Sequence, residues 1–484
     1  MDARSLILLL CLTAACTHPA SIAPVPRTAS PQPAVELVSS NAPNPAVPDR
    51  AVDTARQFLD ELLGHSFERA AAKLDRAMAA SLPPQSLEAA WRSVEGSSPA
   101  PPPPDLIEVI PRPPRTHVWF ICKFNPKPWN IEIVVNAHNL VSGLRVLPVP
   151  PAWTPPDYAK VASFSERRAE VGSPALAGII SMPASPPPYA AVLVHGSGPQ
   201  DEDASVGPRG AGNKMFKDLA WGLASHGVAV LRYPKRTWAY PEQFEGVAFT
   251  LDDEVTRDAC EAIQVAAASA SVSRNRVVII AHSLGAALGP RIAANCPGFG
   301  GMVLLAGPSR SLDHVLFDQF QYLLAIAGKN REETAAELAE LMSGFSLALT
   351  PAGASAEQLA FSGMRAPRSY WADVARYEPL AAMHQAPHVP VFVLQGDRDY
   401  QVGVSEYRAW KRLLRARPDA SCKLYPSLDH RFQAGEGLPT PADYGRPGHV
   451  SRQVIEDIAT WISQQVGEES RTRPAPIVPC RTRA

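Results

Sequence analysis

A serine at the end of an apolar run is the residue of this chain best placed to act as a nucleophile. Residues 277–280 read Val-Val-Ile-Ile, and Ser283 follows three residues later, just before a segment of helical pattern. A strand that turns sharply into a helix at a serine strains the backbone and lifts the hydroxyl above the sheet. Such a turn needs small flanking residues, here Ala281 and Gly285, because larger side chains would collide with adjacent strands. The segment therefore predicts an activated serine.

An activated serine needs a base to take its proton and a carboxylate to orient that base. Two carboxylates, Asp397 and Asp399, follow a later apolar run, and beyond them the chain holds only two histidines. His430 comes after a further short apolar run, whereas His449 stands at the start of the last predicted helix. We therefore expect His430 to be the base and His449 to have a capping or surface role.

The elements that position these residues are strands alternating with helices. From residue 190 onward, short continuous apolar runs alternate with amphipathic segments, which is typical of a mostly parallel sheet covered on both faces. Ser283, the two aspartates and His430 each follow one of the runs. The predicted strands are 191–194, 228–231, 277–280, 302–305, 391–394 and 422–425, and the predicted helices are 214–225, 252–269, 284–294, 408–415 and 454–462.

This order of motifs resembles the alpha/beta-hydrolase superfamily over about residues 157–467. The turn around Ser283 resembles its G-x-S-x-G nucleophile elbow, with Ala281 in place of the first glycine. The segment 396–402 resembles its G-x-x-D-x-x-V acid loop, which selects Asp399. The resemblance implies an alpha/beta-hydrolase fold, the order Ser, acid, His along the chain, and no metal or other cofactor.

The resemblance also implies an oxyanion hole built from two backbone N–H groups. Leu284, which follows the nucleophile, supplies the first, and Ser197, in the Gly-rich turn of residues 195–201, supplies the second. Together with 232–236 and 394–402, this turn resembles two-domain bacterial serine esterases related to dienelactone hydrolases and bile-acid acyltransferases. We expect an insertion at about 309–380, much longer than an ordinary connection, to form a helical lid.

The implied activity is hydrolysis of a small-molecule carboxylic ester through an acyl-enzyme. Acyltransferase, thioesterase and aminopeptidase or amidase activities use the same triad and remain alternatives. An alternative of another class is a catalytically silent surface lipoprotein whose small domain binds a ligand, and the complete triad argues against it. The sequence does not specify the oligomeric state.

A smaller domain precedes the catalytic one, at residues 51–147, and is joined to it by a Pro-rich linker at 148–156. Three amphipathic stretches at 52–62, 67–78 and 87–94 predict helices, and four β-branched and aromatic runs follow. We expect a small α+β domain in which His117 and Trp119 are sheet residues. The order resembles a cone-shaped, nuclear-transport-factor-like domain of unknown function found ahead of some bacterial hydrolases.

The N-terminal residues are typical of an export signal. The apolar run 6–15 follows Arg4 and is too short for a stable transmembrane helix, so residues 1–15 are expected to be a signal peptide. Its end resembles a bacterial lipoprotein signal, in which Cys16 is lipidated; an ordinary cleaved signal peptide is the alternative. Residues 16–50 are rich in proline and predict a disordered tether, so we expect an exported protein anchored to a membrane of the bacterial cell envelope.

Composition and cysteine usage exclude several other classes. Lys plus Arg number 46 and Asp plus Glu 47. The net charge of −1 therefore provides no long-range electrostatic attraction for nucleic acid. The seven cysteines include no C-x-x-C pair, which argues against a zinc or thioredoxin-type site. Cys260 and Cys296 flank the same predicted strand and could form a disulfide, but we expect buried free thiols. The polar tail 468–484 is expected to be disordered.

Overall fold

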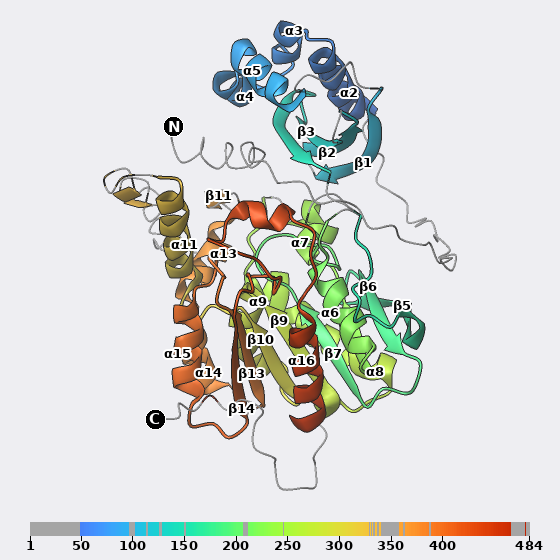
Figure 1. Cartoon of the computed structure of the whole chain (residues 1–484), viewed down its shortest axis with the longest axis vertical. Helices are drawn as coiled ribbons and strands as arrows, with labels where there is room; N and C mark the ends of the chain where they lie inside the picture. Colours follow the sequence, from blue (N-terminus) through green and yellow to red (C-terminus); the bar gives the residue numbers. More distant parts are fainter. Residues whose placement is uncertain are drawn as a thin grey trace. The chain divides into compact units, whose positions relative to one another are not determined.

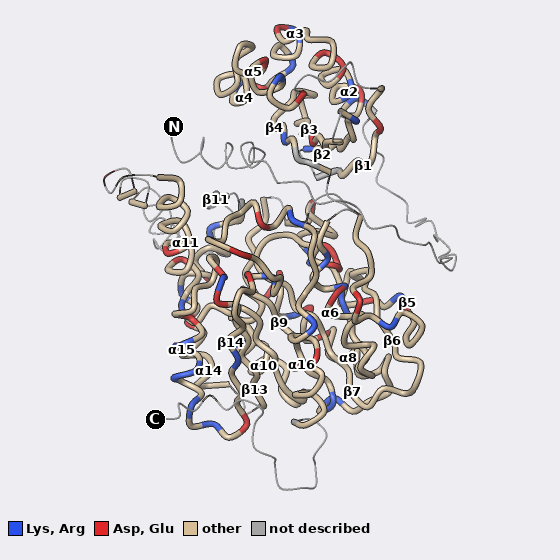
Figure 2. The backbone as a smooth tube through the Cα atoms, in the orientation of Figure 1, with Lys and Arg blue, Asp and Glu red and all other residues tan. Residues whose placement is uncertain are grey.

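The structure is a computed structural model of the 484-residue chain, shown in Figure 1. It describes residues 49–465 and 480, except for gaps at 96–101, 113–114, 125–127, 150–151, 207–211, 245, 329, 331, 333, 336–337, 340–357, 362–363 and 387–388. The chain divides into two compact units, residues 1–149 and 150–484, and each is described by itself. Basic and acidic residues are interspersed along both units (Figure 2). No helix among the described residues is long and apolar enough to cross a bilayer.

The first unit packs helices on a four-stranded antiparallel sheet. The apolar face of its first helix, with Phe58, Leu59 and Leu62, is fully buried in one cluster with strand residues such as Phe120 and Ile133. The helices are α2 (Asp49–Leu63), α3 (Phe67–Ala71), α4 (Arg76–Ser81) and α5 (Pro84–Glu95), and the strands, in sheet order, are β1 (Asp105–Arg112), β2 (Arg115–Cys122), β3 (Trp129–Asn136) and β4 (Val141–Pro148).

Two features of the first unit concern the predicted helix 67–78 and the predicted sheet residue His117. The predicted helix 67–78 is divided, because Leu74 forms a β-bridge with Val141 and the Asp75 carboxylate then accepts the N–H of Met78 to begin α4. His117 lies on β2, as predicted, and its Nδ1 is 2.8 Å from Oε1 of Glu132 on β3.

The second unit contains the predicted mostly parallel sheet, now with eight strands. Strands β7, β8, β9, β10, β13 and β14 run parallel to one another, and β6 and β5 continue the sheet at one edge through antiparallel pairs. In sheet order the strands are β14 (Ala420–Tyr425), β13 (Val391–Gly396), β10 (Gly301–Leu305), β9 (Val277–His282), β7 (Tyr189–Val194), β8 (Val228–Arg232), β6 (Leu176–Pro183) and β5 (Phe164–Val171).

Helices cover both faces of this sheet, as a parallel sheet requires. Alternate strand residues enter different cores: Val192 and Ile279 pack in the cluster that contains α8, whereas Leu193 and Ile280 pack in the cluster that contains α6 and α16. The helical segments are η1 (Val161–Ser163), α6 (Met215–Ala224), α7 (Arg236–Ala239), η2 (Pro241–Gln243), η3 (Asp252–Thr256), α8 (Arg257–Ala270), η4 (Arg274–Arg276), α9 (Leu284–Ala287), α10 (Gly289–Asn295), α14 (Pro379–Gln385), α15 (Val404–Leu414), η5 (Pro441–Gly445) and α16 (Arg452–Gln465).

The predicted lid insertion at 309–380 is only partly described. It contains helices α11 (Leu312–Ile326) and α13 (Arg368–Arg376), in keeping with a helical insertion. A short antiparallel hairpin, β11 (Gln358–Phe361) with β12 (Met364–Pro367), was not expected. Residues 340–357 lie outside the described part of the chain.

The expectation of free thiols at Cys260 and Cys296 is wrong, because the two form a disulfide. Helices α8 and α10 contact each other on the same face of the sheet, which brings Cys260 on α8 next to Cys296 at the end of α10. A second disulfide joins Cys422 on β14 to Cys480. The described part of the predicted disordered tail, Cys480, is therefore tied to the sheet, and the remainder of the tail lies outside the described residues. Cys122 is a buried free thiol.

The Cys260–Cys296 disulfide is expected to stabilise the second unit. It closes a loop with a sequence separation of 36 residues, and restriction of the unfolded chain by such a loop is worth about 4 kcal/mol. Replacing both cysteines by alanine should lower the free energy of unfolding in urea by about that amount, for protein purified under oxidising conditions. Equal stabilities of the double variant and the wild type would contradict a formed disulfide.

Candidate active site

The predicted nucleophile lies at a strained turn between β9 and α9. Ser283 has φ 55° and ψ −121°, a conformation that L-residues rarely adopt. The turn is pressed against the end of β7: a Cβ at Gly285 would lie 2.4 Å from the carbonyl oxygen of His195 and 2.8 Å from that of Val194. Glycine is therefore required at 285, whereas Ala281, at the other flanking position, fits with no exposed surface.

The acid loop and the histidine loop meet beside this turn. Asp399 follows β13, and its Oδ2 lies 2.7 Å from Nδ1 of His430, so that the protonated Nδ1 donates to the carboxylate. The remaining donors to Asp399 hold it in place: the N–H groups of Gln401 and Val402 reach Oδ1 at 2.8 and 2.9 Å, and Gln395 Nε2 reaches Oδ2 at 3.0 Å. The Asp399 side chain is completely buried. This arrangement fixes the tautomer of His430 and leaves its Nε2 free to accept a proton.

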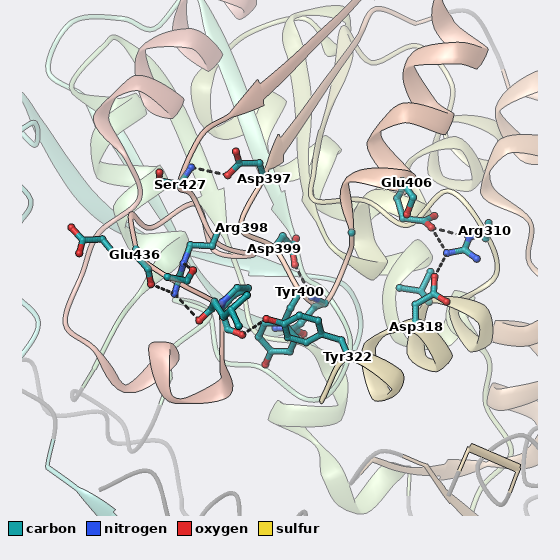
Figure 3. Close-up of a pocket in the computed structure, with 18 residues that line it drawn as sticks. Arg310, Asp318, Tyr322, Asp397, Arg398, Asp399, Tyr400, Glu406, Ser427 and Glu436 are labelled. Atoms are coloured by element: carbon teal, nitrogen blue, oxygen red, sulfur yellow. Dashed lines mark hydrogen bonds and ion pairs between the residues drawn. The ribbon is translucent and has the colours of Figure 1, made fainter. Parts of the chain in front are cut away.

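Asp397, the other candidate acid, does not contact His430. Its side chain points toward Ser427, and its Oδ1 accepts the backbone N–H of Ser427 at 2.7 Å (Figure 3). Asp397 is exposed, in contrast to Asp399. Its role is to fix the turn that follows β14.

The side chain of His282 connects the histidine loop to the nucleophile turn. Nε2 of His282, the residue before Ser283, donates to the carbonyl oxygen of His430 at 2.9 Å, and the two imidazole rings lie 4.6 Å apart. Burial lowers the pKa of His282 well below its usual value, so this ring is neutral and Nε2 carries its proton. Among the described residues, Ser283 Oγ has no hydrogen-bond partner. A serine–histidine hydrogen bond is often long in the absence of substrate and tightens when substrate binds.

The predicted oxyanion loop lies directly over the serine. A Cβ at Gly196 would lie 3.0 Å from Cβ of Ser283 and 3.4 Å from the carbonyl oxygen of His282. The neighbouring Ser197 is therefore adjacent to the nucleophile, and its own carbonyl oxygen accepts Nε2 of Gln200 at 2.9 Å. Leu284 is the first residue of α9, where a backbone N–H has no partner within the helix. Ser197 and Leu284, the two predicted N–H donors, thus both lie next to Ser283.

His195 anchors the start of this loop. It is buried, its ring stacks on Phe216 with centroids 4.3 Å apart, and Nε2 donates to the carbonyl oxygen of Tyr233 at 2.7 Å. Burial lowers the pKa of His195 to about 4, so the ring is neutral near pH 7. His449 lies elsewhere, with Nδ1 3.1 Å from Oδ1 of the buried Asp218, and its pKa is raised by that hydrogen bond.

A cavity of about 870 Å³ borders the acid loop on the side of α11. Figure 3 shows Tyr322 of α11 next to Tyr400, and their rings stack with centroids 5.6 Å apart. On its far side Arg310 is paired with Asp318 and Glu406. Neither Ser283 nor His430 lines this cavity, so it adjoins the triad without containing the nucleophile. In the part of the chain that the structure describes, no group of three His, Cys, Asp or Glu side chains is arranged to bind a metal ion.

Comparison with known proteins agrees with the fold described above, because residues 191–438 match the model of the alpha/beta hydrolase family. Esterase EstD of Thermotoga maritima is 37% identical over 309 residues, which is 63% of this chain and 69% of that protein. Among solved structures, the esterase domain of a Rhodothermus marinus protein matches at 16% identity with a TM-score of 0.38, covering 63% of this chain and 99% of that one. An esterase of Pyrococcus furiosus matches at 13% identity with a TM-score of 0.37, over 66% and 98% of the two chains.

Proposed function

Because the chain belongs to the alpha/beta hydrolase family, we propose that it cleaves carboxylic esters with Ser283 as nucleophile. Ser283 Oγ attacks the acyl carbonyl carbon while His430 Nε2 takes the hydroxyl proton, and the backbone N–H groups of Leu284 and Ser197 stabilise the oxyanion. The proton then passes to the departing alkoxide as the ester bond breaks. Water, activated by the same histidine, attacks the acyl-enzyme and releases the carboxylic acid.

One observation carries this proposal: the buried hydrogen bond between Asp399 and His430 stands beside a serine with a strained backbone. The backbone conformation of Ser283 lowers stability, since residues in this backbone region cost about 1–3 kcal/mol. Together the two features supply the orienting acid, the base and a partly exposed nucleophile in one place. The similarity to Esterase EstD supports an ester as the substrate class.

A panel of acyl substrates tests the substrate class. We expect short p-nitrophenyl esters to be hydrolysed with a higher kcat/KM than matched thioesters, in keeping with the similarity to an esterase. They should also be hydrolysed faster than aminoacyl p-nitroanilides, because a phenolate needs less help to leave than an amine. Adding an amine or alcohol acceptor should leave the yield of free acid unchanged. A preference for the anilides would make the protein a peptidase, acyl transfer to the acceptor would make it a transferase, and no turnover of any substrate would favour the binding lipoprotein.

We also propose that Cys16 anchors the protein to the cell envelope through a covalent lipid, based on the small residues before it and the Pro-rich segment after it. Metabolic labelling with an alkyne fatty acid should mark the wild type in the membrane fraction and should not mark Cys16→Ser. Unlabelled wild-type protein in the periplasmic fraction would refute lipidation and favour an ordinary cleaved signal peptide.

A further inference from the structure

A buried ion pair lies directly beneath the oxyanion loop and has no part in the mechanism described so far. Lys235 is 3% exposed, and its Nζ lies 3.0 Å from Oε1 of Glu254, which is 4% exposed. The same Nζ donates to the carbonyl oxygen of Gly196 at 3.0 Å. A buried ion pair of this kind often contributes little net stability, because removing two charges from water offsets their attraction. Its position next to Gly196 suggests another role.

The geometry of the peptide bond connects Lys235 to the oxyanion. The carbonyl of Gly196 and the N–H of Ser197 belong to one peptide unit, and in a trans peptide these two groups point to opposite sides. Among the described residues, the cis peptide bond is Ser173–Pro174, so the Gly196–Ser197 bond is trans. An ammonium group that holds the carbonyl on one side therefore directs the N–H to the other. Charge assistance at the carbonyl also polarises the peptide and strengthens its N–H as a donor.

The segment that carries Lys235 holds the loop at further points. The backbone N–H of Lys235 donates to the carbonyl oxygen of Gln200 at 2.9 Å, and the carbonyl of Tyr233 accepts Nε2 of His195. The loop is thus fixed at residues 195, 196 and 200 by residues 233–235, and Lys235 Nζ makes the contact in the middle.

Glu254 in turn fixes the ammonium group. It lies in η3, a single π-helical turn, and such turns are frequent at functional sites. Its Oε1 also accepts Oγ1 of Thr237 at 2.9 Å, which sets the rotamer of the carboxylate. Lys235 is therefore held between a fixed carboxylate and the loop carbonyl.

We propose that Lys235, held by Glu254, is a positioning residue of the oxyanion hole that directs the Ser197 N–H toward the developing negative charge. The inference rests on the proposed function of the Ser283 site. It adds a residue that touches no substrate and acts through the Gly196–Ser197 peptide. Lys235 should therefore affect the transition state and leave substrate binding unchanged.

The test compares two double variants that each remove one buried ion pair from the same region. Lys235→Met/Glu254→Gln removes the proposed device without leaving an unpaired charge, and Arg236→Met/Asp258→Asn removes the neighbouring pair, which does not contact the loop. For each, kcat and KM for p-nitrophenyl acetate are measured per folded protein, with folding determined by circular dichroism. The inhibition constant of phenylboronic acid, whose serine adduct is tetrahedral and occupies the oxyanion hole, is measured alongside.

We expect the Lys235 double variant to lose about 10- to 100-fold in kcat, less than the loss caused by deleting an oxyanion donor outright, with KM changed by less than about 3-fold. Binding of the boronic acid should weaken by a similar factor, and the Arg236 double variant should retain kcat and inhibitor affinity within about 3-fold. Retained kcat in the Lys235 double variant, or an equal loss in the Arg236 double variant, would overturn the inference. Wild-type protein that neither turns over ester nor binds the boronic acid would instead refute the proposed function.

Discussion

Replacing Ser283 by alanine is expected to lower kcat for short esters by at least about 10⁴-fold, because the acyl-enzyme cannot form and only binding and the oxyanion donors remain. The fold should be unaffected, since the Ser283 hydroxyl has no hydrogen-bond partner among the described residues. The measurement is steady-state hydrolysis of p-nitrophenyl acetate by the wild type and the variant, with melting temperatures recorded for both.

Ser271 provides a matched control for this substitution. It also has a positive φ, 54°, but lies at the C-terminal end of α8. Ser271→Ala therefore removes a hydroxyl from another residue of positive φ without touching the triad, and its kcat should equal that of the wild type. A Ser283→Ala variant that kept a substantial part of the activity would assign the nucleophile to another residue.

The second large effect is expected at Asp399. Asparagine at this position cannot accept the Nδ1 proton of His430 as a carboxylate does, and it favours the wrong tautomer of the imidazole; the corresponding change in a serine protease costs about 10⁴-fold in kcat. We expect Asp399→Asn to lose at least about 10²-fold in kcat with little change in KM. The kcat and KM of the variant are measured in the same steady-state assay, and melting temperatures serve as a check on folding.

Asp397→Asn is the internal control, because Asp397 lies two residues away and its carboxylate accepts a backbone N–H of the neighbouring turn. Its loss should be less than about 10-fold. The reverse ranking would make Asp397 the orienting acid. Two equally small effects would mean that neither carboxylate orients the histidine.

The catalytic sheet was predictable because its central strands are buried on both faces. Continuous apolar runs such as 277–280 and 391–394 have no other simple interpretation, and they correspond to β9 and β13. The alpha/beta-hydrolase fold that the resemblance implied is confirmed by the match to the family model. The structure also brings Asp399 and His430 together, and it brings Ser197 next to Ser283. Their catalytic roles remain predictions for the experiments above.

The edge of the sheet was missed for a physical reason. Strand β5 reads Phe-Ser-Glu-Arg-Arg-Ala-Glu-Val and is exposed along most of its length, so no apolar run marks it. Its pairing with β6 is set by cross-strand contacts that only the folded chain provides. Local patterns carry little information about such a strand.

Contacts between distant segments could not be predicted from local patterns. The Cys422–Cys480 disulfide spans 58 residues, and cysteine spacing alone does not determine pairing. The hydrogen bond from Lys235 to Gly196 spans 39 residues. The run 232–236 is part of the family resemblance, but nothing in it indicates that its lysine, Lys235, reaches the oxyanion loop.

The central claim is that Ser283 is the activated nucleophile, and covalent labelling tests it most directly. A fluorophosphonate reacts with activated serines and with ordinary serines only very slowly. After incubation with the probe, peptide mapping by mass spectrometry should find a single adduct, on Ser283, and the adduct should be absent from Ser283→Ala. An adduct on another residue, or an unlabelled wild type, would contradict the assignment.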